Sequence, residues 1–507
     1  MSHPNRSADA ERGRRPSVLW ICTDQQRKDS IGAYGNPVVQ TPTLDRLASE
    51  GVRFERAYCQ NPFCSPARAS LLTGLYPRTH GVWHNGIRFD EVGAPTLGDI
   101  LQSQGYRTGS VGKIHLGPTF GPHPPAGFEE SRDYWAKHPE MRDWHGPYCG
   151  FQEVYLSIGH IHYSTSGGHY GTYLEENFPE GLVLFRREHA LLDQGYFETW
   201  RNAMPEEHHY NTWIADRTIE MVDRFAGEPF FIHCSFPDPH HPLSACAPYS
   251  SMYDPADMPE PLAASLDELD QMPPVYRAYH LGEENYYARS PSFPDTIAGA
   301  PLREMMAQMY GMVTHVDHCV GRILEDLSAR GLLKDTLVIF TTDHGELMGD
   351  HGFVLKGPFF YQSLLNVPLL IRLPGGTCAV CHELVAHVDL VPTVLECLGL
   401  EAPEYLPGRS LKGCLEGSPG SPRDAVLTEF RPFGGPNMKV LHTDEWKYVY
   451  YQGEPYGELF NLRDDPEERK NLHGAPECAD VESTLHTRLL DELVRTEAAW
   501  PARGPWV

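Results

Sequence analysis

The sequence has no long apolar run and comparatively few basic residues. No stretch reaches the roughly 18 consecutive apolar residues that a membrane-spanning helix needs. Against 68 Asp and Glu there are 42 Lys and Arg, so the formal net charge at pH 7 is −26. A chain without a basic field does not attract nucleic acid or anionic membrane surfaces. We therefore expect neither as a partner.

Export and disulfide signals are also missing. Residues 1–16 are polar, contain several Arg and lack the apolar core of a secretory signal peptide. The 12 Cys are scattered, and Cys378 and Cys381 form a C-x-x-C pair with no second pair beside it. These features predict a cytoplasmic protein with reduced thiols.

The chain is long enough for two domains. Its 507 residues, 41 % of them hydrophobic, exceed what one hydrophobic core usually serves. We predict a disordered N-terminus at 1–15, a large domain at 16–400, a Gly-, Pro- and Ser-rich linker at 401–423 and a small domain at 424–507. Two insertions, at about 117–200 and 254–300, interrupt the large domain. The first is rich in His and Tyr and is either an irregular surface segment or a substrate-facing wall.

Apolar runs alternate with helical patterns through the large domain. Strands are predicted at 17–22, 106–112, 229–236, 336–340 and 367–373, and helices at 42–50, 95–104, 211–225, 302–330 and 390–397. This order predicts an α/β fold with a large, mostly parallel sheet flanked by helices. After the linker, candidate strands at 426–430, 440–443, 447–451 and 459–462 precede a helix at about 481–496. They predict a small antiparallel sheet with one helix.

Four of the buried strands end in polar clusters. These are Asp24-Gln25, Lys113 with His115, His240 in Pro239-His240-His241-Pro242, and Asp343-His344. Ligands of open α/β sheets bind beyond the carboxyl ends of the strands, so we expect the clusters to converge. Carboxylate, amide and imidazole groups are donors for a divalent cation, and the nearby cations suit an anionic substrate.

The stretch Cys64-Ser65-Pro66-Ala67-Arg68 makes little sense as ordinary packing. Pro66 can open a helix but cannot lie in the interior of one. Cys64 would then lie at a helix N-terminus, which favours an anion, and Arg68 would follow one turn later. The stretch continues to Thr73-Gly74.

These motifs resemble those of the sulfatase family. The signature Cys-x-Pro-x-Arg followed by Thr-Gly is present, and the clusters above, with Lys356, follow in the family's order. The resemblance covers most of the chain, including Glu458 to Leu462 near its end. It implies the fold of the alkaline phosphatase superfamily, with residues 16–400 as the catalytic domain.

The resemblance also implies a site and a mechanism. Cys64, converted to formylglycine by a separate formylglycine-generating enzyme, would supply the nucleophile. One divalent metal, usually Ca²⁺ and sometimes Mn²⁺, would be held by Asp24, Gln25, Cys64, Asp343 and His344. Arg68 would steady the nucleophile, and His240 would protonate the leaving oxygen. The sulfate oxygens would be bound by Lys113, His115 and Lys356. Asn85 would line the anion pocket. His115 could instead take a proton from the nucleophile, and His241 competes with His240.

The metal pairs depart from the commonest sulfatase pattern. Many members have Asp-Asp and Asp-Asn, whereas this chain has Asp24-Gln25 and Asp343-His344, which looks like choline sulfatases and phosphonate monoester hydrolases. The leading hypothesis is a sulfuric ester hydrolase that cleaves a small sulfate monoester. The alternative is a phosphonate monoester or phosphodiester hydrolase with the same site. A third, an inactive anion-binding relative, predicts a missing catalytic residue, and none is missing. The oligomeric state, monomer or homo-oligomer, stays open.

Overall fold

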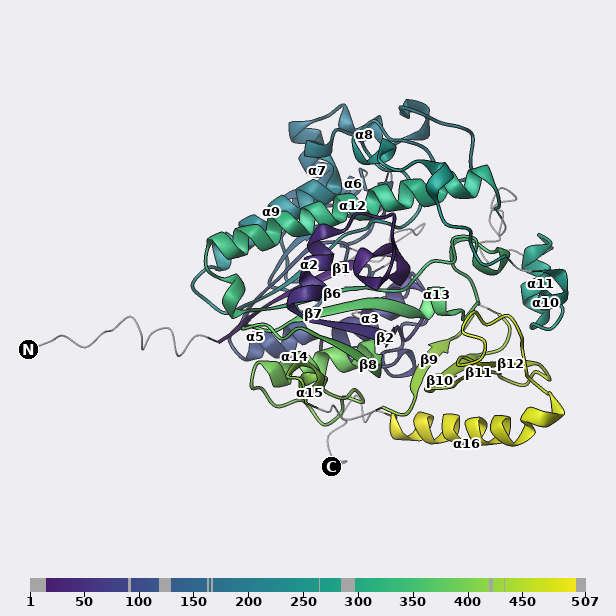
Figure 1. Cartoon of the computed structure of the whole chain (residues 1–507). Coiled ribbons are helices and arrows are strands. Elements are labelled where there is room, and N and C mark those ends of the chain that lie inside the picture. The colour runs from purple at the N-terminus through teal and green to yellow at the C-terminus, as the bar shows by residue number, and fades with distance from the viewer. Residues whose placement is uncertain are drawn as a thin grey trace, which may run out of the picture.

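The computed structural model describes residues 15–89, 93–117, 129–161, 164–165, 167–263, 265–283, 297–418, 423–432 and 434–497. Of the predicted disordered N-terminus, 1–15, residues 1–14 lie outside these ranges, as do residues 264 and 284–296 of the second insertion. The described chain forms two sheets with helices packed around them (Figure 1).

The large sheet has eight strands in the order β4-β3-β5-β1-β6-β7-β2-β8. These strands are β1 Ser17–Thr23, β2 Val52–Tyr58, β3 Arg107–Gly112, β4 Glu153–Leu156, β5 Phe230–Ser235, β6 Thr336–Thr342, β7 Asn366–Arg372 and β8 Ala379–Ala386. Only β7 runs antiparallel to its neighbours, β6 and β2. The predicted α/β fold with a mostly parallel sheet is confirmed.

Strand β1 lies in the middle of the sheet and is buried on both faces. Val18 and Trp20 belong to one apolar core, and Leu19 and Ile21 belong to the other. This alternation follows from the two-residue period of a strand, and a strand covered on both faces reads as one apolar run.

Helices cover both faces of this sheet. The long helix α12 (Ala300–Ala329) packs against α9 (Tyr210–Phe225) and α2 (Pro42–Glu50) on one side, and α3 (Cys64–Thr73), α5 (Leu97–Ser103) and α14 (Leu390–Cys397) lie on the other (Figure 1). The shorter helices are α4 Pro77–His80, α6 Arg132–Lys137, α7 Gly168–Asn177, α8 Gly181–Leu184, α10 Leu266–Leu269, α11 Pro274–His280, α13 Gln362–Leu365 and α15 Lys412–Leu415. No helix in the described chain is long and apolar enough to cross a membrane.

Three strands of the large sheet were not predicted. Strand β4 lies in the first insertion, which also contributes α6, α7 and α8 and is therefore more ordered than an irregular loop. Strands β2 and β8 pair in parallel at the other edge of the sheet. Arg53, Glu55 and Arg56 interrupt the apolar pattern of β2, which explains why its sequence gives a weak signal.

The C-terminal part forms the predicted antiparallel sheet with one helix. Its strands are β9 Val426–Phe430, β10 Met438–His442, β11 Trp446–Tyr451 and β12 Gly457–Asn461. Helix α16 (Ala479–Arg495) packs along β10 and β11 (Figure 1). In the segment predicted as a linker, α15 buries Leu415 completely.

Candidate active site

The polar clusters converge because of the strand order. Strands β3, β5, β1 and β6 are parallel neighbours, so their carboxyl ends lie at one edge of the sheet. Asp24 follows β1, Lys113 follows β3, His240 lies five residues after β5, and Asp343 follows β6. All four side chains are buried.

Helix α3 brings Cys64 to this edge. The helix begins at Cys64 and every one of its residues is buried. The Cys64 Sγ atom lies 3.0 Å from Lys356 Nζ, 3.2 Å from His344 Nε2 and 3.7 Å from Asp24 Oδ1. Asn85 is exposed, and its Oδ1 accepts the Ser65 backbone N–H at 3.0 Å. Asn85 therefore lies at the helix N-terminus, beside Cys64.

Arg68 lies one turn further along α3 and links two strand ends. Its Nε donates to Asp343 Oδ2 at 2.8 Å, and its Nη2 donates to Asp24 Oδ2 at 3.0 Å. Nη1 donates to the Lys113 carbonyl at 3.0 Å and to Ser235 Oγ at 2.9 Å. These bonds fix the guanidinium beside both carboxylates.

Lys356 is a buried cation at the centre of the site. Its Nζ atom has four polar neighbours: Gln25 Oε1 at 2.8 Å, Cys64 Sγ and His344 Nε2 at 3.0 Å each, and His240 Nε2 at 3.3 Å. Lys356 therefore joins residues from three separate strand ends to the start of α3.

Lys113 is the second buried lysine of the site. Its Nζ donates to Asp24 Oδ2 and lies 2.9 Å from His160 Nε2. His115 is also buried, and its backbone N–H donates to the Glu130 carboxylate. The Nδ1 atom of His115 has no hydrogen-bond partner in the described chain.

Several site residues have an unusual backbone conformation. The φ angles are 60° at Gln25, 59° at His115 and 63° at Leu355, which precedes Lys356. Positive φ is uncommon outside glycine, and such strain concentrates at functional sites. The fold therefore maintains costly turns where the predicted site residues lie.

The charges around Asp24 set its protonation state. Burial alone would raise its pKa, but Lys113 and Arg68 hold the pKa of this carboxyl well below its usual range. Burial and then Lys356 lower the pKa of His344 to about 4. Asp24 is therefore ionised and His344 neutral at pH 7, the forms that bind a metal ion.

Burial also shifts the pKa values of His240 and Cys64. Burial, followed by the neighbouring His160, His241 and Lys356, lowers the pKa of His240 well below its usual value. Burial and then Asp24 raise the pKa of the Cys64 thiol. Because the thiolate is the nucleophilic form of cysteine, an unmodified Cys64 is poorly activated at neutral pH.

The residues present fit a divalent cation. One ligand atom from each of Asp24, Cys64, Asp343 and His344 lies within 4.8 Å of the others, and all four residues are buried. The Gln25 amide lies beside them, and its backbone N–H donates to Asp343 Oδ1 at 3.0 Å. Two carboxylates with amide and imidazole donors suit a hard or borderline ion.

The structure also shows site neighbours that the sequence did not single out. Glu346 accepts a hydrogen bond from the Gln25 amide, and Glu130 accepts the backbone N–H groups of residues 115–117. His160, one of several His in the first insertion, contacts Lys113. Glu346 comes two residues after His344 in the sequence, so its presence near the site could have been predicted. Nothing in the sequence locates His160 beside Lys113.

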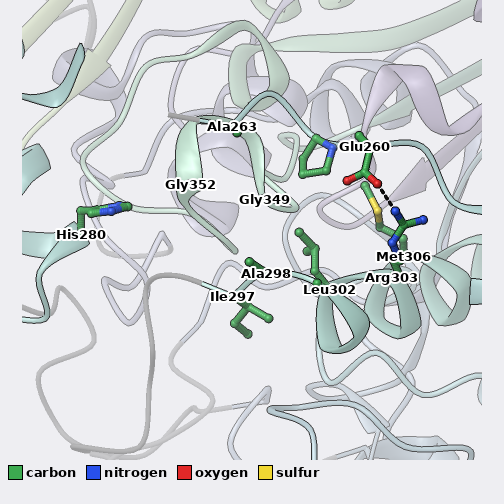
Figure 2. A pocket seen from close by; sticks show the side chains of 12 residues that line it. Glu260, Ala263, His280, Ile297, Ala298, Leu302, Arg303, Met306, Gly349 and Gly352 are labelled. Atoms are coloured by element: carbon green, nitrogen blue, oxygen red, sulfur yellow. Dashed lines mark hydrogen bonds and ion pairs between the residues drawn. The ribbon is translucent and has the colours of Figure 1, made fainter. Parts of the chain in front are cut away.

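Two other features lie apart from the predicted site. A buried group of His209, Cys246 and His315 could hold an ion by spacing, but His315 lies within hydrogen-bond distance of Thr212 and Cys246, and His209 accepts the Asn211 N–H. Ordinary hydrogen bonds therefore explain most of the polar contacts in this group. Figure 2 shows a pocket of about 340 Å³ that none of the predicted site residues lines.

The fold is of the alkaline phosphatase type, and a buried cluster of carboxylates, cations and imidazoles lies at the strand ends of its large sheet. Residues 16–400 match the Sulfatase family model, and residues 349–495 match the model for N-sulphoglucosamine sulphohydrolase, C-terminal. The chain belongs to the sulfatase family and is an enzyme of that family.

Individual relatives cover nearly the whole chain. An arylsulfatase of Clostridium perfringens is 29 % identical over 502 residues, which are 96 % of this chain and 96 % of that protein. A multifunctional alkaline phosphatase superfamily protein of Trinickia caryophylli is 31 % identical over 497 residues, 92 % of each. The crystal structure of a phosphonate monoester hydrolase of Agrobacterium radiobacter superposes with a TM-score of 0.80 at 29 % identity and covers 96 % of this chain and 97 % of that one.

Proposed function

We propose that this enzyme hydrolyses a small sulfate monoester through a formylglycine at residue 64 and a divalent metal. Ca²⁺ is the first candidate for the metal and Mn²⁺ the second. The observation that carries the proposal is the position of Cys64, whose Sγ lies within 3.7 Å of Asp24, His344 and Lys356 at the start of a buried helix. Conversion of Cys64 needs a formylglycine-generating enzyme as a partner in the cell.

The metal would be held by Asp24, Gln25, Asp343, His344 and the side chain of residue 64. When bound, it would polarise the ester oxygens and stabilise developing negative charge. Arg68 holds both carboxylates in place. Lys113 and Lys356 offer fixed cations to the oxygens of the bound anion, which is the arrangement that stabilises charge in transfer reactions of this kind.

The leaving-group oxygen needs a proton donor, and His240 is better placed than His241. His240 Nε2 lies 3.3 Å from Lys356 Nζ, whereas His241 Nδ1 lies 3.3 Å from the Gln25 amide, on the metal side. An anionic ester bound beside Lys356 offsets the charge of that lysine and so favours a protonated His240. His115 binds sulfate oxygens or accepts a proton from the nucleophile, and Asn85 lines the anion pocket.

A phosphonate monoester or phosphodiester hydrolase is the second candidate. Two phosphonate monoester hydrolase structures superpose with TM-scores of 0.80 and 0.77, at 29 % and 25 % identity. The metal pairs Asp24-Gln25 and Asp343-His344 also depart from the commonest sulfatase pattern. Both ester types carry one negative charge, so the same pocket can serve both.

The test is a ratio of rates. Protein whose residue 64 is shown by peptide mass to be formylglycine is assayed for kcat/KM on an aryl sulfate and on the matching aryl phosphonate monoester. We expect the sulfate to be preferred by several powers of ten. A tie, or a preference for the phosphonate, would replace the leading proposal with the second candidate.

A further inference from the structure

His160 contacts two residues that the proposed function assigns to the reaction. It follows β4, the edge strand of the large sheet. Its neighbours Gly159 and Ile161 have φ angles of 77° and 43°. Positive φ is strained for a β-branched residue, so the fold holds His160 in a costly turn, as it does Gln25 and His115.

The first contact is with Lys113. His160 Nε2 lies 2.9 Å from Lys113 Nζ, which also donates to Asp24 Oδ2. An ammonium group has three donors and no acceptor, so Nε2 is the acceptor. With two of its donors fixed, the ammonium presents its third in one direction. His160 and Asp24 together therefore set where Lys113 points.

The second contact is with His240. The two imidazole rings are parallel within 7°, with centroids 3.6 Å apart. The ring of His241 stacks on His240 as well, at 4.0 Å and 25°. Rings packed against the His240 imidazole restrict its rotation, so His160 fixes the plane of the ring that faces Lys356.

The remaining nitrogen of His160 makes no contact within the described chain that would hold the ring in place. A neutral ring that accepts at Nε2 carries its proton on Nδ1, and this Nδ1 is buried without a partner among the residues that the structure describes. The two contacts that do place the ring, with Lys113 and His240, are both with candidate reaction groups.

We propose that His160 is a positioning residue, which orients Lys113 through its Nε2 acceptor and His240 through its stacked ring. The inference rests on the proposed function, in which Lys113 binds the sulfate group and His240 protonates the leaving oxygen. Two substitutions separate the contacts. His160→Gln keeps an acceptor near the Nε2 position but loses the ring, and His160→Phe keeps a flat ring but loses the acceptor.

The two variants should fail in different ways on two aryl sulfates. The 4-nitrophenolate of 4-nitrophenyl sulfate leaves readily without a proton, whereas phenyl sulfate needs an acid, whose contribution is typically about 10²–10⁴-fold. For His160→Gln we expect kcat to fall at least about tenfold on phenyl sulfate and less than about threefold on 4-nitrophenyl sulfate. For His160→Phe we expect a higher KM on both substrates. Its kcat/KM should fall by about tenfold on each of them.

His145 supplies matched controls. It belongs to the same insertion, is half-buried and stacks on His169 at 4.5 Å. His145→Gln and His145→Phe should leave both substrates within about threefold of the wild type. If His160→Gln lowers the rates on both substrates in the same proportion, or if neither variant changes either rate, the positioning role is wrong.

A binding measurement separates this proposal from the proposed function. If formylglycine-containing wild-type protein turns over neither sulfate ester, the proposed function has failed. Calorimetry with inorganic sulfate then still tests the Lys113 contact. His160→Phe should weaken sulfate binding about tenfold and His160→Gln less than about threefold. Equal affinities for the two variants would overturn the contact with Lys113.

Discussion

At the scale of single residues, the site gathers positive charge inside an acidic molecule. Arg68 and Lys113 are buried against the carboxylates of Asp24 and Asp343. Lys356 is buried beside Cys64 and Gln25. The chain as a whole has a formal net charge of −26. Because buried charges are screened much less than exposed ones, these three cations can hold an anion despite the acidic surroundings.

Cys64→Ala tests the proposed nucleophile. The side chain is 1 % exposed and lies among the candidate metal ligands, so its loss removes the reacting group and little packing. We expect kcat/KM on an aryl sulfate to fall by more than about 10³-fold with the Tm nearly unchanged. The control is Cys59→Ala, since Cys59 is equally buried and donates only a long hydrogen bond, to the Leu364 carbonyl. Turnover of Cys64→Ala within a few-fold of the wild type would contradict the mechanism.

His240→Asn and His241→Asn distinguish the two candidate acids. His240 faces Lys356 and His241 faces Gln25. We expect His240→Asn to lower kcat on phenyl sulfate by about 10²-fold or more, with a smaller loss on 4-nitrophenyl sulfate. His241→Asn should instead raise the metal concentration needed for half-maximal activity. The reverse pattern would assign the acid to His241.

At the scale of elements, apolar runs and the polar residues that follow them were sufficient to predict most of the residues that meet at the strand ends. The predicted strands at 17–22, 229–236 and 336–340 are β1, β5 and β6, and the polar residues after them meet as expected. His160 could not be found this way. Its contacts with Lys113 and His240 span 47 and 80 residues of chain, and they depend on how the insertion folds back over the sheet.

The start of α2 shows a second limit of local reasoning. Thr41 precedes this helix and is a residue type that often caps one, but its side chain makes no capping hydrogen bond. Asp317 of α12 does so instead, because its carboxylate accepts the backbone N–H groups of Thr43 at 3.0 Å and Leu44 at 2.8 Å. A cap supplied from 273 residues away leaves no trace in the sequence around the helix.

Asp317→Ala should therefore destabilise the protein through α2. It removes the acceptor for two buried N–H groups, and loss of a cap costs about 1–2 kcal/mol. The free energy of unfolding in urea is the measurement. Asp326→Ala on the same helix is the control, because Asp326 makes an exposed pair with Arg330, and such pairs contribute about 0–1 kcal/mol. Equal losses for the two variants would show that the cap is unimportant.

At the scale of the whole molecule, a buried lysine ties the small sheet to the large domain. Lys447 of β11 is fully buried, lies 2.7 Å from Glu468 and 3.7 Å from Glu458, and donates to the Phe360 carbonyl at 2.9 Å. Phe360 lies four residues after Lys356. The segment that carries Lys356 is thus linked to the C-terminal sheet.

Lys447→Met should cost about 3–5 kcal/mol of unfolding free energy, because it leaves buried glutamates without their cation. Replacing all three groups (Lys447→Met, Glu458→Gln and Glu468→Gln) should recover a large part of that loss, since well-packed neutral groups often substitute for a buried ion pair. Chemical denaturation followed by fluorescence measures both. If the triple variant is no more stable than Lys447→Met, unpaired charge is not the cause of the loss.

Buried neutral histidines give the whole molecule a defined response to acid. Burial lowers the pKa of His80, His233 and His387 to about 3 each. In the unfolded chain these rings titrate near 6.5. Between these values the unfolded state binds more protons than the folded state, so stability falls as the pH drops below about 6.5. Each such ring contributes a slope of up to about 1.4 kcal/mol per pH unit.

We therefore expect the free energy of unfolding to decrease steeply from pH 7 to pH 4, without the plateau that ordinary exposed histidines would allow. His233→Gln should lower the slope between pH 6 and pH 4 by about 1 kcal/mol per pH unit, whatever it does to the stability at pH 7, because the uncharged amide cannot titrate. The control is His189→Gln, since His189 is exposed, and its slope should equal that of the wild type. Urea denaturation at four pH values measures both slopes. Parallel curves for His233→Gln and the wild type would mean that His233 takes up its proton in the folded state as well. The hydrogen bond between His233 Nδ1 and Ser110 Oγ, 3.0 Å long, would then belong to a charged ring.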